Sequence, residues 1–138
     1  KLIIVGEGPE RQSLENETKK CDLDNNTLFF DWQNNVESFL ELVNVLVLPS
    51  FYEGCPNIVL EAFSRDKTVL GSNVKGIRDV LEHEDLMFNL DNPGDLSTKL
   101  IEIYDNQNIL NKLQKLTLSR KSAFSFNWEK RVLNQFNF

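Results

Sequence analysis

The sequence is poor in the residues on which several common kinds of active site depend. It has one histidine and two cysteines among 138 residues. A Ser-His-Asp triad or a Cys-His pair would have to use His83, which stands in the charged run 82–85 and reads as a surface residue. Cys21 and Cys55 lie far apart, which fits neither a metal site nor a disulfide framework, so we interpret them as free thiols in a reducing cytoplasm. We therefore expect no metal and no other cofactor.

Long apolar runs and an excess of positive charge are also absent. No stretch reaches the roughly 18 apolar residues that a membrane span requires. The net charge is -6, which argues against nucleic acid as a partner, because phosphate backbones require a basic surface. The chain does not begin with Met, and residues 1–5 already read as a core strand. We therefore expect a piece of a longer protein.

Short apolar runs alternate with amphipathic stretches along the chain. Strands are expected at 2–5, 27–30, 45–48, 68–70 and 86–88. Helices are expected from Pro9 to about Lys20, over 36–43, from about Pro56, twice after Pro93, and from Trp128. The first run is apolar throughout, which is typical of a strand covered on both faces. The pattern predicts an α/β fold with a Rossmann-like parallel sheet and helices on both faces, one domain over residues 1–138.

Ligands of such sheets bind beyond the carboxyl ends of the strands, so the segments after each strand are candidate sites. The first is Gly6-Glu7-Gly8-Pro9-Glu10-Arg11, whose glycines allow a sharp turn and the close approach of a phosphate. A dinucleotide fingerprint would need a third glycine where Arg11 stands, although Asp31 could imitate its ribose-binding acid. A dinucleotide-binding oxidoreductase domain stays an alternative here, as does a tight turn without a ligand.

The segment 49–61, Pro-Ser-Phe-Tyr-Glu-Gly-Cys-Pro-Asn-Ile-Val-Leu-Glu, is the most informative. Its Pro and Gly residues predict a loop, followed by a helix that begins near Pro56. We expect the free N–H groups of Asn57, Ile58 and Val59 to point into the crevice above the sheet. Together with the positive end of the helix dipole they would form a diphosphate site.

Two carboxylates lie in this segment, Glu53 in the loop and Glu61 in the helix. Helical periodicity puts Glu61 opposite the apolar face, where it either faces a ligand or forms an exposed pair with Arg65. Glu53 either contacts a ligand or is a solvated loop carboxylate. After the fourth strand, Gly76 could bring the backbone close to a ligand, with Lys75 adding charge, or belong to a plain loop.

Taken in this order and spacing, the motifs resemble the C-terminal domain of the retaining glycosyltransferases of family 4, also called glycosyl transferases group 1. The characteristic motif of the family is two glutamates separated by seven residues, here Glu53 and Glu61. Residues 2–11 are similar to the family's Val-Gly-x-Gly-Pro-x-Arg segment, and further matches lie at 76–77, 93–95 and 126–128. The resemblance implies the donor-binding half of a two-domain GT-B enzyme, with the N-terminal acceptor domain absent from this chain.

The resemblance implies a role for each candidate residue. Glu53 is implied as the catalytic residue, in contact with hydroxyls of the donor sugar, and Glu61 as the residue that binds the ribose hydroxyls. The other donor-binding residues implied are Gly54, Cys55, Pro56, Asn57, Ile58 and Val59 for sugar and diphosphate, Gly6 and Gly8 for the phosphate side, and Asp31 and Trp32 for the base.

The resemblance also implies an activity. The enzyme would transfer a sugar from a nucleotide-diphosphate donor to a hydroxyl of a glycan or lipid-linked acceptor, with retention and without a metal. Surface glycan or glycolipid synthesis, in the cytoplasm or peripherally at the inner membrane surface, is the expected setting. This chain alone is expected to be inactive, because the acceptor domain and a basic pair that clamps the diphosphate lie outside it. A non-catalytic nucleotide-binding module of the same fold is the remaining alternative.

Overall fold

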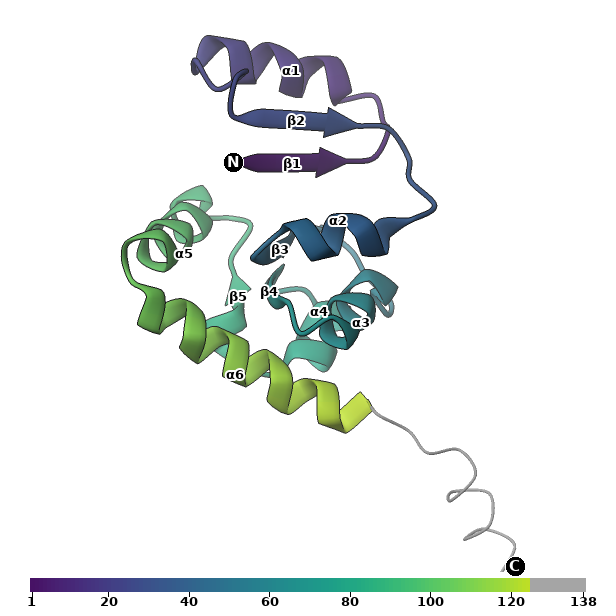
Figure 1. Cartoon of the computed structure of the whole chain (residues 1–138), viewed down its shortest axis with the longest axis vertical. Coiled ribbons are helices and arrows are strands. Elements are labelled where there is room, and N and C mark those ends of the chain that lie inside the picture. The colour runs from purple at the N-terminus through teal and green to yellow at the C-terminus, as the bar shows by residue number, and fades with distance from the viewer. Residues whose placement is uncertain (125–138) are drawn as a thin grey trace, which may run out of the picture. The chain divides into compact units, whose positions relative to one another are not determined.

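The computed structural model describes residues 1–124 (Figure 1), and the helix predicted from Trp128 lies outside them. The chain divides into two compact units, Lys1–Val36 and Glu37 onward. The first holds a sheet of order β1-β2 and the second a sheet of order β3-β4-β5, and all neighbouring strands are parallel. The predicted α/β fold with parallel strands is confirmed, although the strands lie in two sheets and not in the single one expected.

The first unit consists of β1 (Leu2–Val5), α1 (Arg11–Lys20) and β2 (Thr27–Phe30). The strands pair from Leu2 opposite Thr27 to Val5 opposite Phe30. The expectation that β1 is covered on both faces is wrong within this unit, since Leu2 is 51% and Val5 40% exposed. The physical reason is that the unit has one helix, and one helix covers at most one face of a sheet.

Helix α1 begins two residues later than predicted, at Arg11 and not at Pro9. The Arg11 N–H donates to the Gly8 carbonyl at 3.2 Å and so closes a turn over Pro9 and Glu10. Proline is favoured at the second position of such a turn, because its fixed φ matches it. Pro9 therefore indicates the turn that precedes the helix and not the first residue of the helix.

The second unit begins within α2 (Val36–Leu42), whose first residue still belongs to the first unit. Its further elements are β3 (Val45–Leu48), α3 (Asn57–Ser64), β4 (Thr68–Ser72), α4 (Lys75–Leu81), the 3-10 turn η1 (Glu84–Leu86), β5 (Met87–Phe88), α5 (Pro93–Asp105) and α6 (Gln107–Phe124).

Strand β4 is the centre of this unit's sheet and extends two residues beyond the prediction. Gly71 and Ser72 pair with Met87 and Phe88 of β5, and this pairing continues the strand past its apolar run. Strand β5 begins one residue later than predicted, because the N–H of Leu86 donates to the His83 carbonyl at 3.0 Å in η1. The same register brings the carboxyl end of β4 beside β5.

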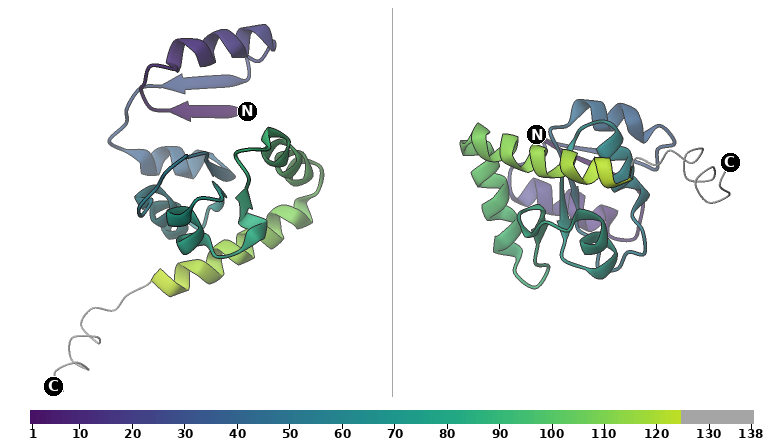
Figure 2. Two further views of the ribbon diagram at one scale, coloured as in Figure 1. Left: turned by 180° about the vertical axis from the view of Figure 1, so that it is seen from behind. Right: turned by 90° about the horizontal axis from the view of Figure 1, so that it is seen from below.

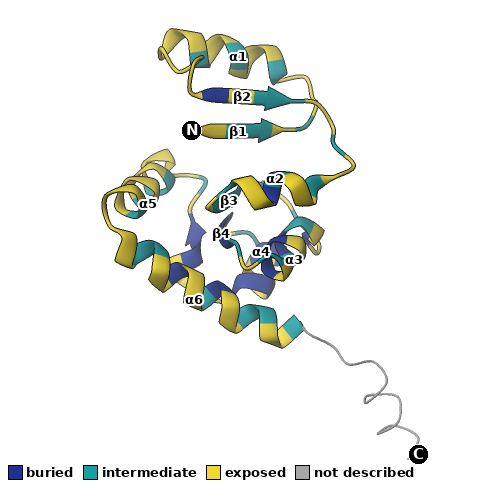
Figure 3. Ribbon diagram, in the orientation of Figure 1, coloured by how far each residue is buried: buried dark blue, intermediate teal, exposed yellow. Residues whose placement is uncertain are grey.

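All five residues of β4 are buried (Figure 3). Because successive side chains of a strand point to opposite faces, both faces of β4 must be covered. Helices α3, α4 and α6 all contact this strand, and α6 also contacts α3; Figure 2 shows the ribbon from two further sides. The large core side chains include Phe63, Leu70, Ile77, Leu81 and Leu86. Each contributes about 1.5–3 kcal/mol to folding by leaving water.

The buried face of α6 includes a polar residue. Leu113 and Thr117 are buried, whereas Leu118 is 39% exposed. The fully buried residue is thus Thr117, and the leucine that follows it is turned partly to solvent. No helix within residues 1–124 has both the length and the apolar character needed to cross a membrane.

Two helices end on an aspartate in the left-handed conformation, Asp22 after α1 (φ 54°) and Asp66 after α3 (φ 57°). In each turn the next N–H donates to the carbonyl five residues earlier, Leu23 to Thr18 at 2.7 Å and Lys67 to Ala62 at 2.9 Å. This is the hydrogen bonding of a Schellman motif, in which glycine is the usual residue.

Candidate functional site

The loop after β3 leads directly into α3 and carries most of the predicted site. Pro56 is buried in an extended conformation as the N-cap, and the helix begins at Asn57, as predicted to within a residue. The Val59 N–H donates to the Pro56 carbonyl at 3.0 Å, so the expectation of a free N–H at Val59 is wrong. The N–H groups of Asn57 and Ile58 have no partner among residues 1–124. The first turn of α3 therefore offers two free donors at the positive end of the helix dipole.

The other loop residues are open to solvent. Gly54 and Cys55 are exposed, and a Cβ added to Gly54 would meet no atom within 4 Å. Cys55 is a free thiol, as is Cys21. Phe51 and Tyr52 are also highly exposed, so the loop presents its backbone and two aromatic rings to whatever approaches it.

Glu53 is half-buried and held by a hydrogen bond. The Ser50 hydroxyl donates to Oε1 of Glu53 at 2.8 Å. The second oxygen, Oε2, has no partner among the described residues. The Ser50 carbonyl accepts in turn a hydrogen bond of 2.5 Å from the hydroxyl of Ser72, which is fully buried at the end of β4. The carboxylate is thus fixed at one oxygen and available at the other.

Glu61 lies on the exposed side of α3, opposite Val59, Ala62 and Phe63, as the periodicity predicted. The alternative pairing with Arg65 is not formed. Arg65 instead donates to Glu41 at 2.7 Å and to Glu37, both on α2. Within residues 1–124 the Glu61 carboxylate has no hydrogen-bond or ion-pair partner, and its acceptor capacity is therefore free for a ligand.

Gly76, the second residue of α4, lies against the backbone of the Glu53 loop. A Cβ built on Gly76 would stand 2.6 Å from both the Glu53 carbonyl carbon and the Gly54 carbonyl oxygen. Only glycine allows so close an approach of two backbones. Gly76 thus brings α4 close to the chain's own loop, which differs from the close approach to a ligand that we considered.

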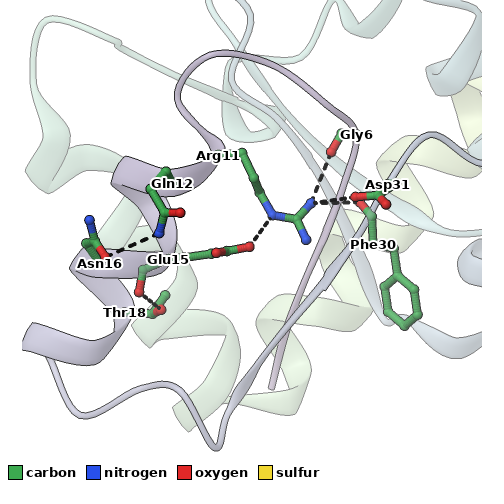
Figure 4. A network of polar contacts seen from close by, with 8 residues as sticks. All are labelled: Gly6, Arg11, Gln12, Glu15, Asn16, Thr18, Phe30 and Asp31. Carbon is green, nitrogen blue, oxygen red and sulfur yellow. Dashed lines mark hydrogen bonds and ion pairs between the residues drawn. The ribbon is translucent and has the colours of Figure 1, made fainter.

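The predicted phosphate turn lies in the first unit. Gly6 has a φ of 138°, which favours glycine, and a Cβ at Gly6 or Gly8 would meet no atom within 4 Å. The Arg11 side chain lies between α1 and the ends of both strands (Figure 4). Its Nη1 donates to the Gly6 and Phe30 carbonyls, each at 3.3 Å, and its Nε donates to Glu15 at 2.6 Å. The guanidinium thus occupies the position at which a dinucleotide fingerprint has its third glycine, which disfavours the oxidoreductase alternative.

Asp31 and Trp32 follow β2 in the same unit, and both are exposed. Asp31 Oδ1 lies 3.4 Å from Arg11 Nη1. The backbone near Asp31 and Trp32 is the part expected to meet the base, and there the Trp32 N–H donates to Oε1 of Glu7 at 3.3 Å. A base that used this N–H would have to displace an exposed carboxylate from it.

The sequence alone indicated no role for Ser50, for Ser72 or for the backbone contact of Gly76. Ser72 stands at the end of an apolar run, where a small polar residue is a signal for a site at the carboxyl edge of a parallel sheet. Its contact with Ser50 cannot be predicted from the sequence, because the two residues become neighbours only when β3 and β4 pair. Within residues 1–124 no group of three or more His, Cys, Asp or Glu could hold a metal ion.

Comparison with known proteins gives a family. The pattern described as "Glycosyl transferases group 1" matches residues 1–119. A UDP-Gal:alpha-D-GlcNAc-diphosphoundecaprenol alpha-1,3-galactosyltransferase of Escherichia coli is 29% identical over 138 residues, covering 99% of this chain and 33% of the relative. An uncharacterized glycosyltransferase of Methanocaldococcus jannaschii is 38% identical over 82 residues, covering 59% of this chain and 20% of the relative. The chain spans at most about a third of the length of these two curated relatives.

Solved structures of other proteins share this fold. The structure of HepE from Anabaena in complex with UDP and glucose superposes with a TM-score of 0.76 at 15% identity, covering 88% of this chain and 35% of that one. At this identity the likeness shows the fold alone, whereas the family pattern extends over most of the chain, from β1 into α6. The chain therefore belongs to the glycosyl transferases group 1 family.

Proposed function

We propose that this chain is the donor-binding half of a retaining glycosyltransferase that transfers a sugar from a uridine diphosphate donor to a hydroxyl acceptor. The observation that carries the proposal is the free carboxylate of Glu61 on a helix whose first turn has two free N–H groups. A carboxylate accepts two hydroxyl hydrogens at once, which suits the vicinal hydroxyls of a ribose. The choice of uridine is supported by the name of the Escherichia coli relative.

The diphosphate would bind at the start of α3. The N–H groups of Asn57 and Ile58 and the helix dipole favour negative charge there. The same groups would stabilise the charge that develops on the leaving phosphate, because preorganised donors need no rearrangement as the bond breaks. For the first unit taken by itself, we propose that Gly6 and Gly8 contact phosphate. No step in this scheme requires a metal ion, and we propose that none takes part.

Glu53 would hold the donor sugar. Its Oε1 is fixed by Ser50, and Oε2 is free to accept a hydrogen bond from a sugar hydroxyl. A contact of this kind orients the anomeric carbon and so supports a reaction with defined stereochemistry. We propose retention as that outcome.

The acceptor would bind outside this chain. Because the chain spans at most about a third of the relatives' length, we propose that an N-terminal domain holds the acceptor and that the chain alone does not catalyse transfer. The name of the Escherichia coli relative describes a lipid-diphosphate acceptor. A lipid-linked acceptor would place the reaction at a membrane surface, so peripheral association with the membrane belongs to the proposal.

The test is a calorimetric titration of the full-length protein with UDP, GDP and ADP. We expect UDP to bind, and Glu61→Ala to weaken it about tenfold to a hundredfold, as expected for hydrogen bonds to a charged group. Glu102→Ala is the matched control, since Glu102 is an exposed helical glutamate on α5. Binding of none of the three nucleotides at millimolar concentration, or equal affinity in Glu61→Ala and Glu102→Ala, would contradict the proposal.

A further inference from the structure

A chain of two hydrogen bonds connects the core of the second unit to Glu53. Ser72 is fully buried at the carboxyl end of β4, and its hydroxyl donates to the Ser50 carbonyl at 2.5 Å. The Ser50 hydroxyl then donates to Oε1 of Glu53 at 2.8 Å. A carbonyl and a carboxylate only accept, and each hydroxyl has one hydrogen, so the direction of both bonds is fixed.

The first serine is itself rigidly placed. Ser72 pairs with Phe88 in the β4–β5 ladder, and its own carbonyl accepts the Val74 N–H at 2.8 Å. Because residue 50 follows the end of β3 by two positions, the bond from Ser72 joins the first residues of the loop to the neighbouring strand. The position of residue 50 is therefore set by the sheet.

The loop that carries Glu53 also packs against the start of α4. The start of α4 approaches the Glu53 and Gly54 backbone so closely that only a glycine fits at position 76. Backbone contact fixes where residue 53 lies, and the Ser50 hydroxyl fixes how its carboxylate is turned. One carboxylate oxygen is thereby occupied inside the protein, and the other has no partner among the described residues.

We propose that Ser50 and Ser72 are positioning residues that orient the Glu53 carboxylate toward the sugar of the donor. The proposal rests on the function proposed above. Ser50 acts on the carboxylate directly, and Ser72 acts through the Ser50 backbone. Neither residue has to touch the nucleotide, so their effect is confined to the sugar part of the ligand.

The experiment compares UDP with UDP-galactose and UDP-glucose as ligands of the full-length protein. Ser50→Ala should weaken the better-bound UDP-sugar about tenfold, the usual effect of losing a charge-assisted hydrogen bond, and should change UDP affinity less than about twofold. Ser72→Ala should act in the same direction. Ser50→Thr retains the hydroxyl and should restore UDP-sugar affinity.

Ser97→Ala is the matched control, because the Ser97 hydroxyl also donates to a backbone carbonyl, that of Gly94 at 3.0 Å, but on α5. Equal loss of UDP and UDP-sugar affinity in Ser50→Ala would overturn the positioning role and indicate general damage to the fold. Unchanged UDP-sugar affinity in Ser50→Ala would overturn it as well. If the unaltered protein binds neither UDP nor a UDP-sugar, the proposed function fails, and this inference fails with it.

Discussion

Replacing Gly76 with alanine adds one methyl group where α4 meets the loop that carries Glu53. The new Cβ would stand 2.6 Å from two backbone atoms of residues 53 and 54. The Glu53 carbonyl oxygen would be closer still, so α4 or the loop must move by more than roughly 0.8 Å to reach the 3.4 Å of ordinary contact. Overpacking of this kind costs about 1–3 kcal/mol. With about 4 °C for each kcal/mol in a chain of this size, we expect the melting temperature to fall by about 4–12 °C.

Thermal unfolding and UDP-sugar titration of Gly76→Ala together measure this effect. Gly94→Ala is the matched control, because Gly94 is the second residue of α5 as Gly76 is of α4. A Cβ at Gly94 meets only the Asn92 side-chain oxygen, at 3.3 Å, and that side chain can turn away. If Gly76→Ala melts at the same temperature as Gly94→Ala and binds UDP-sugars normally, backbone contact does not restrict position 76 to glycine.

Three further predictions concern stability. Phe63→Ala should lower the free energy of unfolding by about 3–5 kcal/mol, because the ring is 2% exposed, whereas Phe51→Ala should change it by less than about 0.5 kcal/mol. Urea denaturation compares them, and equal midpoints would contradict the assigned core. Arg11→Lys should speed amide exchange in β1 and β2, since a single ammonium nitrogen cannot replace Nη1 on the two strand-end carbonyls and Nε on Glu15 together; unchanged exchange would speak against that clamp. Lys112, by its hydrogen bond, lowers the pKa of Asp85. Its contribution, under about 1 kcal/mol for an exposed pair, should be present above about pH 4 and be lost as pH falls through the lowered pKa. Asp85→Asn should remove this pH dependence in acid titrations followed by urea unfolding, and an unaltered profile would show that another group causes it.

The order of the strands and of most helices within residues 1–124 was predictable because apolar runs and turn residues alternate so regularly. No helix was predicted at Lys75–Leu81, where the structure has α4. The other errors lie at the ends of elements, where tertiary pairing decides. Strand β4 continues through Gly71 and Ser72, which are not strongly apolar, because β5 supplies partners for them. The division of the strands into two sheets was also not predictable, since a sequence pattern gives the existence of strands and not their pairing.

The candidate site was predictable to the extent that it depends on one segment. The exposure of Glu61 followed from helical periodicity, and the start of α3 from Pro56. What could not be predicted are contacts between distant segments. The pairing of Arg65 with α2 leaves Glu61 free, and the Ser72 hydroxyl reaches residue 50 across the sheet. Both depend on which elements become neighbours, and spacing along the chain does not encode that.

The two aspartates that follow α1 and α3 in the left-handed conformation are positions at which a substitution could raise the stability of this protein. A left-handed conformation costs a residue with a Cβ about 1 kcal/mol relative to glycine, and the short polar side chain of aspartate reduces this only in part. Asp66 also pairs with Lys121 at 2.6 Å, so glycine there would lose an ion pair. The Asp22 side chain has no partner among residues 1–124. Protein engineering toward a more heat-resistant variant could therefore begin at position 22, in a turn that contains none of the candidate donor-binding residues.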